Sequence, residues 1–173
     1  MRGGHRLFAL VAAVLPLAAV HAAALVVTKS SSVVEDAVST TFPKALPGAS
    51  VDYAIVVNNP NGLLSGQSIG AVQISDTIPD NMVFSTANYG GANGPIEFTD
   101  GDLLGLGLLG SGLGYSFRGF ADDTDSVEFF NGVTWSYRPV AGLDPAVRAI
   151  RVTLSGTQRA SSSFRLRFRV RVK

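Results

Sequence analysis

Five acidic residues are the first candidates for chemistry, because carboxylate oxygens are the ligands that calcium prefers. Asp122, Asp123 and Asp125 form one cluster, and Asp100 and Asp102 lie earlier in the chain. Their spacing lacks the pattern of an EF-hand loop, and nothing in the sequence shows that the two clusters meet. We therefore expect polar turns and predict no metal site, with calcium binding kept as an alternative.

Catalytic constellations are hard to build from the remaining residues. Asp123 and Glu128 would have to act as the two carboxylates of a glycosidase, and the sequence fixes no separation between them. The two histidines, His5 and His21, both lie in the apolar N-terminal segment, which removes Ser-His-Asp catalysis from the rest of the chain. The chain has no cysteine, which excludes thiol catalysis and Cys-based zinc sites. We predict that the protein is not an enzyme.

A glycine motif also fails to predict a cofactor. Residues 105–110 spell G-x-G-x-x-G within a Leu/Gly-rich segment that runs from Leu103 to Gly114. A dinucleotide site needs a strand before this motif and a helix after it, so that a phosphate meets the helix N-terminus. Neither is predicted here, so we expect a loop that packs locally, and no cofactor.

The last residues alternate strictly between apolar and basic side chains, which is the pattern of a half-buried strand. The apolar face holds Phe164, Leu166, Phe168, Val170 and Val172, and the other face holds Arg165, Arg167, Arg169, Arg171 and Lys173, here called the cationic strip. Positive charge on a strand hinders edge-to-edge pairing, which favours a solvated face. The alternatives are pairing with acids such as Asp52 or Glu128, docking of an anionic surface polymer, and addition of this strand or of Leu25–Lys29 to a neighbouring subunit's sheet. No aromatic residues are interleaved with the cations, which disfavours nucleic-acid readout.

The chain as a whole predicts an all-β fold. Turn signals separate short runs of strand residues at intervals typical of a β-sandwich, and beyond the N-terminus no segment has a convincing helical period. We expect strands at Leu25–Lys29, Val51–Val57, Ile69–Ser75, 115–120, Val147–Leu154 and Ser163–Lys173, and a loop or irregular edge over Ser30–Ala45. A hairpin with a type I′ Asn-Gly turn is expected over residues 127–137, with Trp135 and Tyr137 in the core or, alternatively, stacking on carbohydrate.

The N-terminus has the features of a cleaved export signal. Arg2 and Arg6 precede an apolar run from Leu7 to Val20, and small residues at positions 20 and 22 predict cleavage after Ala22. Residues 1–22 would then be a signal peptide and residues 23–173 the mature domain, with no later membrane span. Losing two arginines changes the net charge from +1 to −1, which argues for neither nucleic acid nor a membrane surface.

Several segments together resemble the DUF11 family of extracellular repeat domains. The matching pieces include Pro47-Gly48, the strand Val51–Asn58 and the run Ile74–Pro79, while later matches include Thr134–Tyr137 and the terminal strand. The resemblance implies an immunoglobulin-like antiparallel β-sandwich and a secreted or cell-surface structural module. It supplies no catalytic residues. The single copy and the Leu/Gly-rich segment depart from the family pattern.

These observations lead to one expected function and two alternatives. We expect a non-enzymatic exported module of the cell surface or envelope that contacts an envelope protein or a surface glycan. The first alternative is a subunit of a surface fibre that self-associates by exchange of terminal strands. The second is a calcium-dependent carbohydrate-binding module.

Overall fold

The structure is a computed structural model that describes residues 23–101 and 110–173. The predicted signal peptide, residues 1–22, lies outside the described residues, as do residues 102–109 of the Leu/Gly-rich segment. The strands are β1 (Val26–Glu35), β2 (Ser50–Asn58), β3 (Ile69–Gly70), β4 (Gln73–Thr77), β5 (Met82–Ser85), β6 (Ile96–Asp100), β7 (Leu113–Gly114), β8 (Val127–Phe130), β9 (Leu143–Asp144), β10 (Ala149–Thr153), β11 (Ser155–Gln158) and β12 (Ser163–Val172), with one short 3-10 helix, η1 (Leu63–Ser65). The predicted all-β class is confirmed for this part of the chain.

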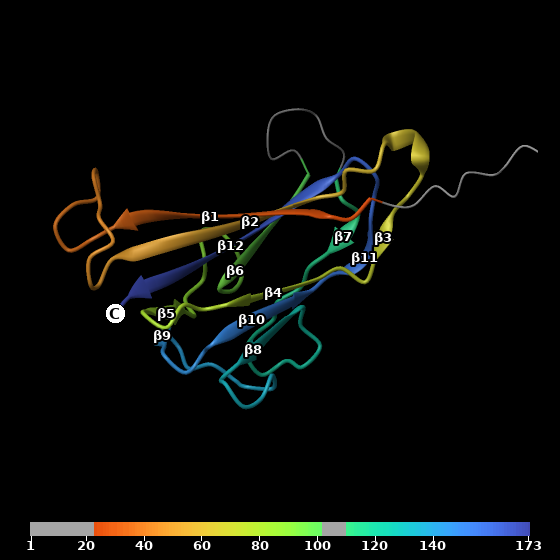
Figure 1. The fold of residues 1–173 in the computed structure, drawn as a ribbon. Coiled ribbons are helices and arrows are strands. Elements are labelled where there is room, and N and C mark those ends of the chain that lie inside the picture. Colours follow the sequence, from red (N-terminus) through yellow and green to blue (C-terminus); the bar gives the residue numbers. More distant parts are fainter. Residues whose placement is uncertain (1–22, 102–109) are drawn as a thin grey trace, which may run out of the picture.

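The strands form two layers with hydrophobic side chains between them (Figure 1). One layer has the order β1-β2-β12-β5-β9, and β6 pairs with β12 beside β5. The other consists of β4-β10-β8 and β3-β11-β7, in which β11 continues almost directly from β10. All pairings between these strands are antiparallel. Within residues 23–101 and 110–173, no helix is long and apolar enough to cross a membrane.

The terminal strand β12 lies at the centre of its sheet. It pairs with β2 along one side over nine residues from Ser163 to Arg171, and with β6 and then β5 along the other. Its apolar residues from Phe164 to Val170 are buried, as the alternation predicted. Both edges of β12 are paired within the subunit, so in this arrangement it offers no free edge to another subunit's sheet.

Several local predictions differ from the structure. The strand expected over 115–120 is wrong, because these residues belong to no strand, and the single strand expected over Ile69–Ser75 is broken into β3 and β4. Of Ser30–Ala45, expected to be a loop or irregular edge, residues 30–35 continue the edge strand β1 with a register shift after Val33, and residues 36–45 form no strand. An edge strand needs few core contacts and so tolerates the Ser-rich run. The segment 134–137 forms only an isolated bridge, Phe129 to Tyr137. The Asn131-Gly132 turn is not type I′, since only Gly132 has a positive φ, and the Asn131 side chain instead accepts the N–H groups of Val133 and Thr134.

Candidate functional site

The middle of the cationic strip is neutralised by acids on the neighbouring strands. Arg169 donates from Nε and one terminal nitrogen to the two carboxylate oxygens of Asp52, at 2.6 and 3.0 Å. Arg167 lies opposite Glu97 in the β6 register, and its Nε is 2.5 Å from a Glu97 oxygen. For Arg169, the alternative of pairing with Asp52 therefore occurs, in place of the favoured solvated face. Glu128 instead contacts Arg151, its neighbour on β10 in the other layer, at 3.3 Å.

A tyrosine closes over the same two arginines. Tyr89 lies in the segment between β5 and β6, and its hydroxyl donates to Asp52 at 2.6 Å. The guanidinium groups of Arg167 and Arg169 lie 5.3 and 5.6 Å from the centre of its ring, within cation–π range. Burial, together with the hydrogen bond to Asp52, raises the pKa of Tyr89 to about 12. Tyr89 therefore remains a hydrogen-bond donor at neutral pH.

The two acids in this network are held in their ionised forms. Burial opposes ionisation of Asp52, but the hydrogen bonds from Arg169 and Tyr89 outweigh it and the pKa of Asp52 is lowered. The hydrogen bond from Arg167 lowers the pKa of Glu97. Ion pairs of this kind hold β2, β6 and β12 in register.

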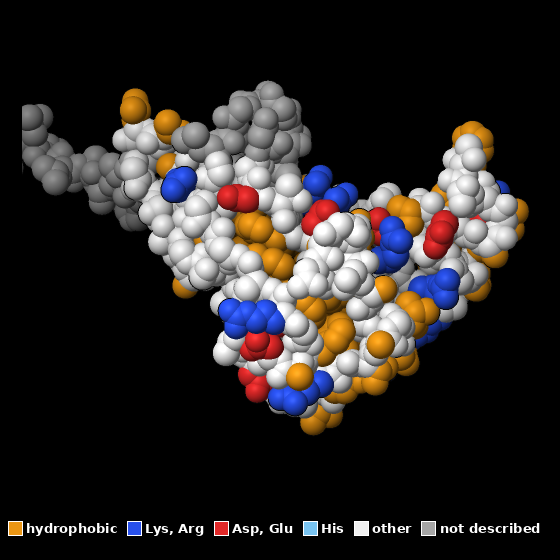
Figure 2. Space-filling view, turned by 180° about the vertical axis from the view of Figure 1, so that it is seen from behind, with side chains coloured by type: hydrophobic (Ala, Val, Ile, Leu, Met, Phe, Trp, Pro, Cys, Tyr) orange, Lys and Arg blue, Asp and Glu red, His pale blue; other side chains and the backbone are white. Residues whose placement is uncertain are grey.

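The rest of the cationic strip is discontinuous. Arg165 and Arg171 have no ion-pair partner among the described residues, and they lie six residues apart on β12. The Lys173 ammonium donates to the backbone carbonyl of Asp80. On the face shown in Figure 2, basic and acidic side chains are interspersed. The strip thus offers two separated guanidinium groups, and this geometry does not favour docking of a long anionic polymer.

The acidic loop uses its oxygens to hold its own backbone. Asp125 accepts the N–H groups of Arg118 and Gly119, and Asp122 accepts both the N–H and the hydroxyl of Thr124. The bonds from Thr124 lower the pKa of Asp122. Asp100 accepts the N–H of Ser111 on another segment, and Asp102 lies outside the described residues. Among the described residues, no group of three or more acids is gathered as metal ligands.

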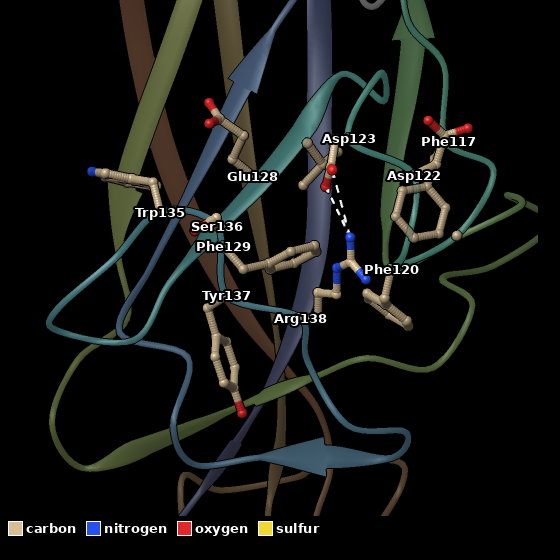
Figure 3. Close-up of a pocket in the computed structure, with 12 residues that line it drawn as sticks. Phe117, Phe120, Asp122, Asp123, Glu128, Phe129, Trp135, Ser136, Tyr137 and Arg138 are labelled. Atoms are coloured by element: carbon tan, nitrogen blue, oxygen red, sulfur yellow. Dashed lines mark hydrogen bonds and ion pairs between the residues drawn. The ribbon is translucent and has the colours of Figure 1, made fainter.

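A second site lies beside that loop, in a hollow of about 140 Å³ that we call the aromatic pocket. Its lining residues include Phe117, Phe120, Asp122, Asp123, Glu128, Phe129, Ser136, Tyr137 and Arg138. In Figure 3, Arg138 extends past the rings of Phe120 and Phe129 toward Asp123. The Arg138 guanidinium is 3.4 Å from an Asp123 oxygen, and both side chains are largely exposed, at 59% and 82%. The pocket combines phenyl walls with an accessible ion pair at its mouth.

The phenyl walls are anchored in the hydrophobic core. Phe129 is buried and contacts the core ring of Phe84, with ring centres 5.8 Å apart. Phe120 packs on Phe129 at 5.5 Å, and Phe117 meets Phe120 edge to face at 5.3 Å. This row of rings leads from the core to the surface, so the wall of the pocket is fixed by packing.

Trp135 has another role than the one expected. Its indole points away from Arg138 in Figure 3, stacks on Phe130 at 5.0 Å and lies 3.8 Å beneath the guanidinium carbon of Arg151. The indole of Trp135 is thus held between Phe130 of β8 and Arg151 of β10, on the outer face of these two strands. The Tyr137 hydroxyl donates to the buried carboxylate of Asp144 at 3.0 Å. Tyr137 also packs against the core, as expected. Both residues line the aromatic pocket, but these contacts hold their rings, so neither is arranged as an open stacking platform.

The sequence reasoning found only part of the pocket lining. It singled out Asp122, Asp123, Glu128, Trp135 and Tyr137, which all line the pocket. It did not single out Phe117, Phe120 or Arg138, because these come from segments that converge only in the fold. The only local signal was the aromatic content of the 117–130 region beside its acids. Asp123 and Glu128 do line one pocket, yet each contacts an arginine, which is not the setting of a carboxyl group that must donate a proton.

Comparisons of the chain with protein-family models, curated proteins and solved structures found no match. The resemblance to the DUF11 family stays a prediction from the residues quoted above.

Proposed function

We propose that this protein is a non-enzymatic, exported module of the cell surface or envelope, with an immunoglobulin-like β-sandwich fold, that binds a glycan through the aromatic pocket. The export-signal pattern of residues 1–22 and the resemblance to the DUF11 family support the location. The two antiparallel layers around one core support the fold.

The observation that carries the glycan proposal is the mixed lining of the aromatic pocket. A sugar ring presents C–H groups on its faces and hydroxyls at its edge, so it needs an apolar wall beside charged hydrogen-bonding groups. Phe117 and Phe120 supply the wall, while Asp123 and Arg138 supply acceptors and donors at the mouth. A hollow of this volume accommodates one six-membered ring, which suits a terminal sugar residue of a longer chain.

The test is calorimetric titration with a panel of neutral and acidic oligosaccharides. Arg138→Met and Asp123→Asn should each weaken binding about tenfold, the loss expected for one exposed hydrogen bond to a charged group. Both side chains are exposed, so the fold should survive, as circular dichroism would check. The matched controls are Arg148→Met and Asp80→Asn, which alter an exposed ion pair of 3.8 Å outside the pocket. The proposal fails if no oligosaccharide binds, or if the controls weaken binding as much as the pocket variants.

A further inference from the structure

Strand β1 leaves one long edge of its sheet open. It is ten residues long, and among the described residues β2 is the only strand that pairs with it. The sheet's other edges are β9, which has only two residues, and β6, which has five and carries Glu97 and Asp100. An open strand of this length presents a row of unpaired backbone N–H and C=O groups, which is a template for another strand.

Charged side chains on an edge strand normally hinder its pairing with another strand, but those of β1 contact other parts of the subunit. The Lys29 ammonium lies 2.7 Å from Asp76 on β4 and 4.5 Å above the Tyr53 ring, so it is held toward the other layer. Glu35 lies at the end of the strand, beyond a register shift, and accepts the hydroxyl of Ser50. Apart from Lys29, the residues between Val26 and Val34 are therefore only small polar and apolar ones.

The edge also exposes apolar surface. Val26 and Val27 are 51% and 55% exposed, although both lie in a regular strand. The strand contains no proline, and its one register shift comes after Val33. By contrast β4, an edge of the other layer, has five residues and carries Asp76. Of these edges, β1 is the one suited to pairing.

We propose that β1 pairs with β1 of a second copy of this protein, antiparallel about a twofold axis that passes through Ser30. In antiparallel pairing, opposite side chains lie on the same face of the sheet. When a strand pairs with a copy of itself, each residue therefore faces a residue an even number of positions away along the strand. The two residue numbers then add to the same even number in every pair. A twofold axis through Ser30 makes that number 60, and the contact is isologous.

This register is self-complementary on both faces. On the core side Val27 lies opposite Val33, as their β2 partners Val57 and Val51 indicate. On the outer side Thr28 lies opposite Ser32, a favourable cross-strand pair of hydroxyl residues. A twofold axis through Lys29 would instead place two ammonium groups opposite each other, and one through Ser31 would place Lys29 opposite Val33. Ser30 is thus the centre that the side chains favour.

The consequence is one continuous sheet across two subunits. Each subunit keeps its own aromatic pocket, whose residues lie in the 117–138 region and not on β1. A ligand with repeated sugar units could then engage both pockets at once and bind more tightly than to one. The dimer itself is inferred from β1 alone and does not depend on the glycan proposal.

The first experiment is light scattering after size exclusion, over a wide range of protein concentration. The protein should approach twice the monomer mass as concentration rises. Ser30→Lys places two like charges directly opposite each other and should abolish the dimer, and Ser30→Glu should do the same. Ser30 is exposed, so neither change should unfold the monomer. Mixing the two variants should restore a dimer, because lysine then faces glutamate.

The second experiment tests the register by cross-linking, which is clean because the chain has no cysteine. Ser30→Cys should form an intermolecular disulfide under mild oxidation, since opposite residues have Cα atoms about 4.5 to 5.5 Å apart. Ser32→Cys is the matched control. Its two copies would be about 14 Å apart along the paired strands, beyond the reach of a disulfide.

The outcomes are decisive in each direction. A concentration-dependent dimer, its rescue by mixing the charge variants and selective cross-linking at position 30 would support the proposal. A protein that stays monomeric at every concentration would overturn it. Equal cross-linking at positions 30 and 32, or a mixture of charge variants that stays monomeric, would overturn the proposed register and with it the twofold pairing.

Discussion

Replacing Asp52 by asparagine should show that the middle of the cationic strip stabilises the fold. Asp52 is only 15% exposed in its side chain and accepts three hydrogen bonds, two from Arg169 and one from Tyr89. Asparagine keeps the shape but removes the charge and one acceptor oxygen. Hydrogen bonds to charged groups contribute about 1.5 to 3 kcal/mol, and the partial exposure of Arg169, 42%, favours the lower part of that range.

The expected loss in the free energy of unfolding is therefore about 2 kcal/mol. For a domain of this size that corresponds to a fall in Tm of roughly 4 to 8 °C. Urea unfolding can be followed through the fluorescence of Trp135, the single tryptophan. Asp80→Asn is the control, because Asp80 is fully exposed and its contact with Arg148 is 3.8 Å, and it should cost less than about 0.5 kcal/mol.

A double-mutant cycle with Arg169→Met isolates the pair itself. The coupling between the two substitutions should be about 1 kcal/mol or more. Equal losses for Asp52→Asn and Asp80→Asn, or additive effects of Asp52→Asn and Arg169→Met, would refute the reasoning. Arg169 would then be free to bind a ligand, and the docking interpretation of the strip would regain support.

Three further outcomes are expected. The pKa values of Asp52 and Glu97 are lower in the folded protein than in the unfolded chain, where they are about 4. Their contribution to the free energy of unfolding is therefore complete above about pH 4 and is lost as the pH falls through the folded-state pKa values. The stabilities of the native and Asp52→Asn proteins, measured against pH, should converge in that acid range. Gly94→Ala should destabilise by over about 1 kcal/mol and weaken oligosaccharide binding, since φ is +129° and the new Cβ would overlap the ring of Phe117; unchanged melting would contradict this. Phe129→Ala should lower the free energy of unfolding by about 3 to 5 kcal/mol, because the ring is buried in the core, and a loss below about 1 kcal/mol in thermal melting would contradict this.

The strands whose side chains alternate between core and solvent were predictable from the sequence. Val51–Val57 and the terminal strand have a period of two because one face of each meets the core, and both occur as expected in β2 and β12. The edge strand β1 was predicted only to Lys29, because a strand exposed on most sides needs no apolar period. The interruption between β3 and β4 was also missed, where Ala71 adopts a φ of 54° that no local sequence signal announces.

The candidate sites were less accessible to sequence reasoning. The pairing of Asp52 with Arg169 could be anticipated, since outward residues of adjacent strands meet, but the tyrosine that covers them comes from a separate segment. The aromatic pocket depends on how the 117–125 segment packs against β8 and residues 136–138. Such contacts follow from tertiary packing, which short-range patterns do not encode.

The most direct test of the glycan proposal is an NMR titration of the isotopically labelled protein with the oligosaccharide that binds best in the panel. The account predicts that chemical-shift changes concentrate at the backbone amides of Gly119 to Asp123 and at Arg138, while Arg165 and Arg171 on β12 remain unchanged. Changes confined to β12, or a spectrum that no oligosaccharide in the panel perturbs, would contradict it.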